Sequence, residues 1–167
     1  MKRSGALLAT AVFLCLAPGT VAGLIPWWIS RWKVQPSFFG LEPLRWIGVL
    51  LIVLSLPVLL ESFGRFAVEG LGTPAPVLPT QHLVVKGFYR YVRNPMYVAV
   101  ASIILGQALL LGNSYLLFYG AVVWTAFHAF VLSYEEPKLL STYGAEYQAY
   151  CGRVRRWLPH ATIRVSQ

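Results

Sequence analysis

Two groups of polar residues stand out in this apolar sequence of 167 residues. The first is the stretch GFYRYVRNPMY, residues 87–97, and the second is the glutamate pair Glu135 and Glu136 with the tyrosine-rich sequence after it. Arginines beside the free N–H groups of a helix start bind carboxylates or phosphates, whereas ionised glutamates accept hydrogen bonds. Each group also has a structural explanation, the first as a basic interface anchor and the second as acids favoured at a helix N-terminus.

The first group predicts the start of a helix. Gly87 permits a tight turn, Asn94 is kept out of the helical region by the following proline, and Pro95 suits the first helical turn. We therefore expect a membrane helix to begin near Pro95, with Arg90 and Arg93 beside its free N–H groups. From this motif alone, an anion site and an interface anchor are equally good interpretations.

The second group predicts a break followed by an amphipathic helix. Pro137 cannot donate a hydrogen bond to Ser133, so the helix should kink or restart there. Consecutive helical residues project about 100° apart, so only one glutamate should face a ligand, and we expect Glu136 to be that residue. Helical spacing then gives one apolar face, made by Leu140, Tyr143, Tyr147, Tyr150 and Val154.

The elements that must position these groups are membrane helices. The chain is 57% hydrophobic and only 12% charged, where soluble domains carry about 25% charged residues. We expect one all-α integral membrane domain, residues 1–167, with a cytoplasmic loop at 61–95 and a partly helical cytoplasmic tail at 135–167. Its four expected spans are about 5–29, 44–62, 96–111 and 115–134. The first could instead be a cleaved signal peptide, but its apolar run is too long, and we keep it as a span kinked at Pro18 and Gly19.

The distribution of basic residues predicts the orientation of these spans. All Lys and Arg residues except Arg31, Lys33 and Arg45 fall on the side that holds the termini and the 61–95 loop. The positive-inside rule places this side in the cytoplasm. The last two spans form a hairpin, so the residues around Arg93 and those around Glu135 should meet on that face.

Other chemistries find little support in the sequence. The histidines lack metal-ligand spacing and no nucleic-acid-binding module is visible, so we expect no metal and no nucleic acid as partners. Cys15 and Cys151 do not suggest a disulfide framework. His128 falls inside the fourth span, where an ionisable residue is a functional hypothesis by default, with Gln107 as a possible partner. We favour a neutral, hydrogen-bonded packing role for it over a functional one.

The ordered combination of these motifs resembles one group of integral membrane enzymes, the isoprenylcysteine carboxyl methyltransferase and phospholipid methyltransferase superfamily. The upstream sequence GLGTPAPVLPTQHLVV is similar to that of bacterial members. The residues that carry the resemblance are Gly87, Tyr89, Arg93, Asn94, Pro95 and Tyr97, then Glu135 and Glu136, and finally Tyr143, Gly144, Tyr147, Tyr150 and Pro159.

The resemblance implies an S-adenosylmethionine-dependent methyltransferase of the bacterial inner membrane. Its methyl acceptor would be a lipid or a small lipophilic carboxylate, amine or thiol, reached from the membrane. Glu146 is our candidate base for an amine or thiol, and Arg153 our candidate for steering an anionic acceptor. The cofactor would be bound by Tyr89, Arg93, Asn94, Pro95, Tyr97, Glu135 and Glu136.

Two other functions are weighed against a methyltransferase. A non-catalytic lipid-binding or assembly protein would keep the scaffold without the cofactor, and an enzyme related to the sterol reductases would bind NADPH. The expected spans are too few for such a reductase, and no GxGxxG fingerprint is present. Cofactor binding separates the three.

The predicted orientation has a direct test. A reporter fused after Gln167 should be cytoplasmic, and the variant Gln35→Cys should be labelled by an impermeant thiol reagent added outside the cell. The parent chain is the unlabelled control, because Cys15 is expected within a span and Cys151 in the cytoplasm. Labelling from the cytoplasmic side only would reverse the orientation and separate the site from the cytoplasmic cofactor.

Overall fold

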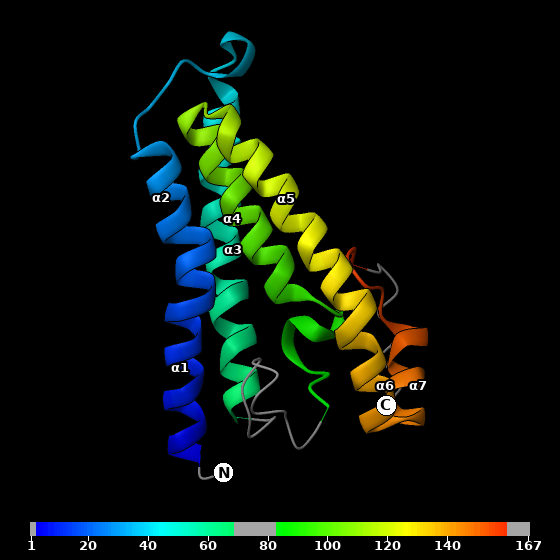
Figure 1. Ribbon diagram of the computed structural model, residues 1–167. Coiled ribbons are helices and arrows are strands. Elements are labelled where there is room, and N and C mark those ends of the chain that lie inside the picture. The colour runs from blue at the N-terminus through cyan, green and yellow to red at the C-terminus, as the bar shows by residue number, and fades with distance from the viewer. Residues whose placement is uncertain (1–2, 69–82, 160–167) are drawn as a thin grey trace.

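A computed structural model describes residues 3–68 and 83–159, and these ranges contain helices and no strand (Figure 1). The middle of the connection that begins near residue 61, including the sequence similar to bacterial proteins, lies largely outside the described residues. The first helical elements are α1 (Arg3–Gly19), a π-helical turn (Thr20–Leu24) and α2 (Ile25–Ser30), which follow one another directly, and then α3 (Pro43–Val68), α4 (Pro95–Leu111) and α5 (Ser114–Phe130). A second π-helical turn (Val131–Glu135) and the short helices α6 (Glu136–Tyr143) and α7 (Ala145–Arg153) follow. The predicted all-α fold is confirmed.

Three of the helical segments are long and apolar enough to cross a membrane. They are Ala11–Ser30, Pro43–Arg65 and Ser114–Tyr143. The fourth apolar helix, α4, has 17 residues and is therefore about 25 Å long, slightly less than the ~30 Å hydrocarbon core of a bilayer. The protein is thus an integral membrane protein with three long apolar helices and one shorter one.

The ends of the helices group as the sequence predicts. The start of α1, the end of α3 and the pair α6 and α7 lie at one end of the molecule, and α4 starts on the same side but nearer the middle (Figure 1). The connection from α2 to α3 lies at the opposite end. The assignment of the first end to the cytoplasm remains a prediction from the basic residues.

Helices α3 and α4 make the most extensive helix contact of the described residues. A Cβ atom on Gly48 would lie 2.5 Å from the carbonyl oxygen of Gly106, and a Cβ on Gly106 would lie 2.7 Å from that of Gly48. Small residues allow such backbone approach where lipid surrounds the helices and apolar burial gives little drive for association. The two glycines therefore set the distance between α3 and α4.

A tight turn joins α4 to α5 as the predicted hairpin. Gly112 has a φ of 65°, and the Asn113 side chain accepts a hydrogen bond of 3.1 Å from the Leu116 backbone N–H, which caps α5. At the same end, Arg45 Nη1 donates a 2.7 Å hydrogen bond to the carbonyl of Leu110, one of the carbonyls left without a helical partner. The Gly112 conformation, the Asn113 cap and the Arg45 hydrogen bond thus all stabilise this turn. The start of α4 and the end of α5 lie together, away from the turn.

The π-helical turn Thr20–Leu24 directly follows Pro18 and Gly19, the residues at which a kink is predicted. Side chains of the hairpin donate hydrogen bonds to the backbone carbonyls of this turn and so attach the first helix to α4 and α5. The bonds run from Gln107 Nε2 to Ala22 (2.7 Å) and from Tyr119 Oη to Val21 (2.8 Å).

The tail is helical as expected, but it forms two helices instead of one. Gly144 separates α6 from α7 with φ 51° and ψ −123°, a conformation that is strained for residues with a side chain. The expected apolar face is therefore divided. Tyr147, Tyr150 and Val154 are buried together, whereas Leu140 of α6 remains exposed.

The α3–α4 contact predicts a local cost of adding one methyl group. Gly48→Ala should destabilise the protein by about 1 to 3 kcal/mol, because the new Cβ overlaps the α4 backbone. Gly64→Ala in the same helix is the matched control, since nothing lies within 4 Å of its added Cβ. It should leave stability unchanged or raise it by up to about 1 kcal/mol. Thermal unfolding in detergent measures both, and equal effects of the two variants would contradict this packing.

Candidate active site

The two polar groups that stood out in the sequence meet at one end of the α4–α5 hairpin. Tyr97, in the first turn of α4, donates a 2.8 Å hydrogen bond from its hydroxyl to Glu135 Oε2. Arg93, just before that helix, has its Nη1 3.2 Å from Glu136 Oε1. The predicted meeting of the residues around Arg93 and Glu135 is therefore confirmed as geometry.

The adjacent glutamates contact different partners, as their angular separation predicts. Glu135 closes the second π-helical turn and reaches Tyr97 on α4. Glu136 begins α6 and accepts two hydrogen bonds from Arg156, at 2.7 Å from Nε and 2.9 Å from Nη2. Such bidentate pairing is the strongest geometry available to an arginine and a carboxylate. It raises the pKa of Arg156, chiefly through the hydrogen bonds to Glu136.

Arg93 carries one buried donor that no described residue satisfies. Its side chain is only 13% exposed, and its Nη1 also donates a 2.7 Å hydrogen bond to the sulfur of Cys151. Its Nε is buried without a hydrogen-bond partner among the described residues. Because a buried, unpaired donor is costly, this nitrogen is the site's clearest indication of a missing acceptor.

The segment after α7 covers the start of α4. The Arg93 backbone N–H donates to the Arg155 carbonyl at 2.9 Å, and Asn94 Nδ2 donates to the Arg156 carbonyl at 3.2 Å. Asn94 therefore holds the tail in place and does not cap α4 with its side chain. Pro95 is the first residue of α4, as predicted, and is buried.

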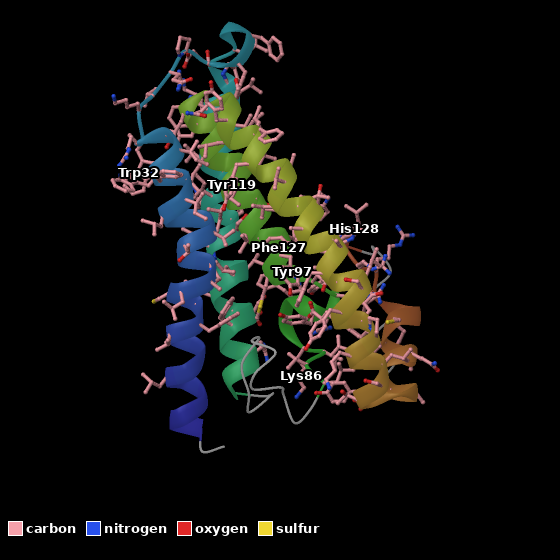
Figure 2. The ribbon with its side chains drawn as sticks, viewed as in Figure 1. Trp32, Lys86, Tyr97, Tyr119, Phe127 and His128 are labelled. Atoms are coloured by element: carbon pink, nitrogen blue, oxygen red, sulfur yellow. The ribbon has the colours of Figure 1, made fainter. Side chains whose placement is uncertain are left out.

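His128 also contacts this segment, and its predicted pairing with Gln107 is wrong. Its Nδ1 accepts a 3.1 Å hydrogen bond from Trp157 Nε1, while Gln107 bonds to the turn after α1. The Trp157 ring packs on Trp124 at 4.7 Å between centroids. Figure 2 shows His128 on the flank of α5, next to the tail.

The tyrosines of the tail form a small core beneath this segment. Tyr150 donates a 2.7 Å hydrogen bond from its hydroxyl to the Tyr89 carbonyl, and both residues are buried. Burial raises the pKa of Tyr89, Tyr147 and Tyr150 well above the usual value, which is itself already above physiological pH, so the neutral phenol is favoured further. Their geometry is that of packing and hydrogen bonding.

Two predicted residues lie apart from this cluster. Glu146 and Arg153 are both exposed on α7, and Arg153 Nε donates to the carbonyl of Ala149 in its own helix at 3.2 Å. Within residues 3–68 and 83–159, no hydrogen bond or ion pair joins either side chain to Glu135 or Glu136.

Three contributors were missed in the sequence. Arg156 was one of several basic residues in RVRR, and nothing in that run distinguishes it from its neighbours. Cys151 was set aside because it has no cysteine partner. Glu61 of α3 lies against Gly87, where its carboxylate accepts a 3.5 Å hydrogen bond from Phe88 N and leaves no room for a Cβ on the glycine. Gly87 has the positive φ that the predicted tight turn requires, 60°.

The tail's attachment through Arg156 can be measured separately from any ligand. Arg156→Ala should speed hydrogen exchange of the Arg93 backbone amide about ten- to hundredfold. This amide donates to the Arg155 carbonyl, which would move away with the tail once the Arg156–Glu136 pair is lost. Arg155→Ala is the matched control: this exposed side chain is lost while the accepting carbonyl stays. Equal exchange in both variants would show that the Glu136 pair does not hold the tail.

Comparison with known proteins places these motifs in a family. The phospholipid methyltransferase family profile matches residues 44–146. The chain is 40% identical over 79 residues to the protein-S-isoprenylcysteine O-methyltransferase of Schizosaccharomyces pombe, a match that covers 46% of this chain and only 33% of that protein. It is also 39% identical over 64 residues to an uncharacterized protein of Haemophilus influenzae, covering 38% of this chain and 100% of that protein. Because the family profile covers more than half of the chain, the protein belongs to the phospholipid methyltransferase family.

Proposed function

We propose that the protein is an S-adenosylmethionine-dependent methyltransferase that acts on a lipid or lipophilic acceptor at the cytoplasmic face of the membrane. The observation that carries this proposal is the contact of Arg93 and Tyr97 with the glutamate pair, with Arg93 Nε left as a buried donor. Family membership favours this function over the reductase and the non-catalytic scaffold.

The residues of this cluster fit the polar part of the proposed cofactor. Its amino-acid end carries a carboxylate and an ammonium group, and its ribose carries hydroxyls. Arg93 Nε is a donor suited to the carboxylate, and the oxygens of Glu135 and Glu136 are acceptors suited to the ammonium or the hydroxyls. We assign Tyr89, Asn94 and Pro95 supporting roles, since they hold the tail and the start of α4 around this cluster.

When bound, the cofactor supplies an electrophilic methyl group on a sulfonium, and the protein's task is alignment and exclusion of water. The tail segment contributes to this task by covering the start of α4 through the Arg93, Asn94 and Arg156 hydrogen bonds. A carboxylate acceptor would need positioning only. An amine or thiol must lose a proton, for which Glu146 stays our candidate base, and Arg153 our candidate contact for an anionic acceptor.

Binding of the cofactor tests the proposal. In detergent or lipid, calorimetry should detect S-adenosylmethionine or its demethylated product but not NADPH. Arg93→Ala should weaken binding about ten- to hundredfold, the effect of losing one charged hydrogen bond. Glu136→Ala should weaken it more than Glu135→Ala, because Glu136 orients both Arg93 and Arg156.

Lys138→Ala is the control for these variants. Lys138 is exposed on α6, two residues after Glu136, and its loss should change the affinity little. If the wild-type protein binds neither form of the cofactor at millimolar concentration, the non-catalytic scaffold is the better description. Normal binding by all the site variants would reduce the glutamates to a structural role at the helix start.

A further inference from the structure

An apolar pocket lies beside the proposed cofactor site, where α1 faces α3 and the α4–α5 hairpin. Its cavity volume is about 100 Å³, and the space between its walls reaches about 480 Å³ when the open mouth is counted. We call it the α1 pocket. Its walls are Phe13, Ala17 and Pro18 from α1, Val21 from the π-helical turn after α1, and Phe63, Met96, Tyr97, Val100 and Phe127 from the other helices.

Tyr97 joins this pocket to the polar cluster. Its ring lines the pocket, 4.8 Å from the ring of Phe127 between centroids, while its hydroxyl donates to Glu135. Figure 2 shows Tyr97 and Phe127 together in the space bordered by α4 and α5. The Tyr97 side chain therefore connects the apolar pocket with the hydrogen bond to Glu135 in the proposed cofactor site.

α1 and the π-helical turn after it make nearly half of the wall, and both lie outside the segment that matches the family, residues 44–146. Their position is fixed by the bonds from Gln107 and Tyr119 to the π-helical turn and by the stacking of Phe13 on Phe63 at 6.1 Å. A wall that is held firmly and is not part of the shared family segment is well placed to make one member differ from another.

We propose that the α1 pocket binds the hydrocarbon chain of the methyl acceptor and that Phe13 and Ala17 determine which chains fit. The assignment of the chain to a methyl acceptor rests on the proposed function. A hydrocarbon is the occupant that the lining fits: the walls offer a guest no charged side chain, and they belong to helices apolar enough for a bilayer. An acceptor held this way has its polar end on the Tyr97 side of the pocket.

Photolabelling tests the pocket directly. The probe is palmitic acid with a diazirine in mid-chain, and the readout is the labelled fraction of the peptide that contains Met96 and Val100, measured by mass spectrometry. Ala17→Phe fills the pocket and should lower this labelling about tenfold, the effect of overpacking by one to two kcal/mol. Ala11→Phe is the matched control, because Ala11 is exposed on the same helix and does not line the pocket.

S-adenosylmethionine binding, measured on the same samples, separates the two proposals. Ala17→Phe should bind the cofactor as the wild type does while methyl transfer to membrane lipid falls. Unchanged labelling in Ala17→Phe, or an equal loss in Ala11→Phe, would overturn the pocket assignment. A wild-type protein that binds no cofactor would overturn the methyl-acceptor role, while a tenfold response to Ala17→Phe would still support a hydrocarbon site.

A second variant serves if the larger side chain prevents folding. Phe13→Ala widens the pocket, so labelling by a methyl-branched version of the probe should rise relative to labelling by the straight chain. An unchanged ratio in a folded Phe13→Ala protein would overturn the role of Phe13 as a selecting residue.

Discussion

The packing of the tail against the start of α4 depends on the Glu136 carboxylate, which pairs with two arginines from different parts of the chain. Arg93 precedes α4, and Arg156 lies in the segment after α7, so one carboxylate connects the hairpin to the tail. A half-buried carboxylate of this kind is expensive to leave unpaired. Loss of Glu136 would therefore leave Arg93 and Arg156 without their shared carboxylate. The tail segment would then no longer be held over the start of α4. The fold and the proposed site share this one interaction.

Two π-helical turns, Thr20–Leu24 and Val131–Glu135, interrupt the long helices next to residues of the proposed site. The turn Val131–Glu135 precedes Pro137, which has no N–H for a regular helix, and it ends at the residue that meets Tyr97. The turn Thr20–Leu24 is bonded by Gln107 and Tyr119, and it borders the α1 pocket. In both places, a departure from α-helical geometry lies beside a side chain or wall of the proposed site. Straight helices of the same composition would span the membrane without forming these contacts.

Local rules predicted those parts of the fold that depend on neighbouring residues. Pro95 fixed the start of α4, the Gly112 turn fixed the hairpin, and the hairpin brought Arg93 to the glutamates. The break at Gly144 was missed because a glycine inside a regular apolar spacing is compatible with a continuous helix until its φ is known. Helical spacing also predicts which residues share one face of a helix, but not which of them are buried by other parts of the protein.

Contacts between residues far apart in the sequence could not be predicted from the sequence. Of the several arginines in the tail, Arg156 pairs with Glu136 through two hydrogen bonds, and this pairing depends on where the chain runs after α7. Ala17 and Phe13 have the same appearance in the sequence as residues that face lipid, since both environments require apolar side chains. The pocket exists because the turn after α1 is bonded to the hairpin, a tertiary constraint that periodicity does not encode.

Tyr97 explains how a water-soluble cofactor and a lipid chain could meet at one place. Its hydroxyl belongs to the polar cluster and its ring to the apolar wall, so a single side chain lies on the boundary between them. Phenylalanine would keep the wall and leave Glu135 without this donor, whereas serine would lose the wall and fall short of the glutamate. A residue with an apolar body and a polar tip is therefore required by the geometry at this position, and the chemistry proposed for the site takes place at that same boundary.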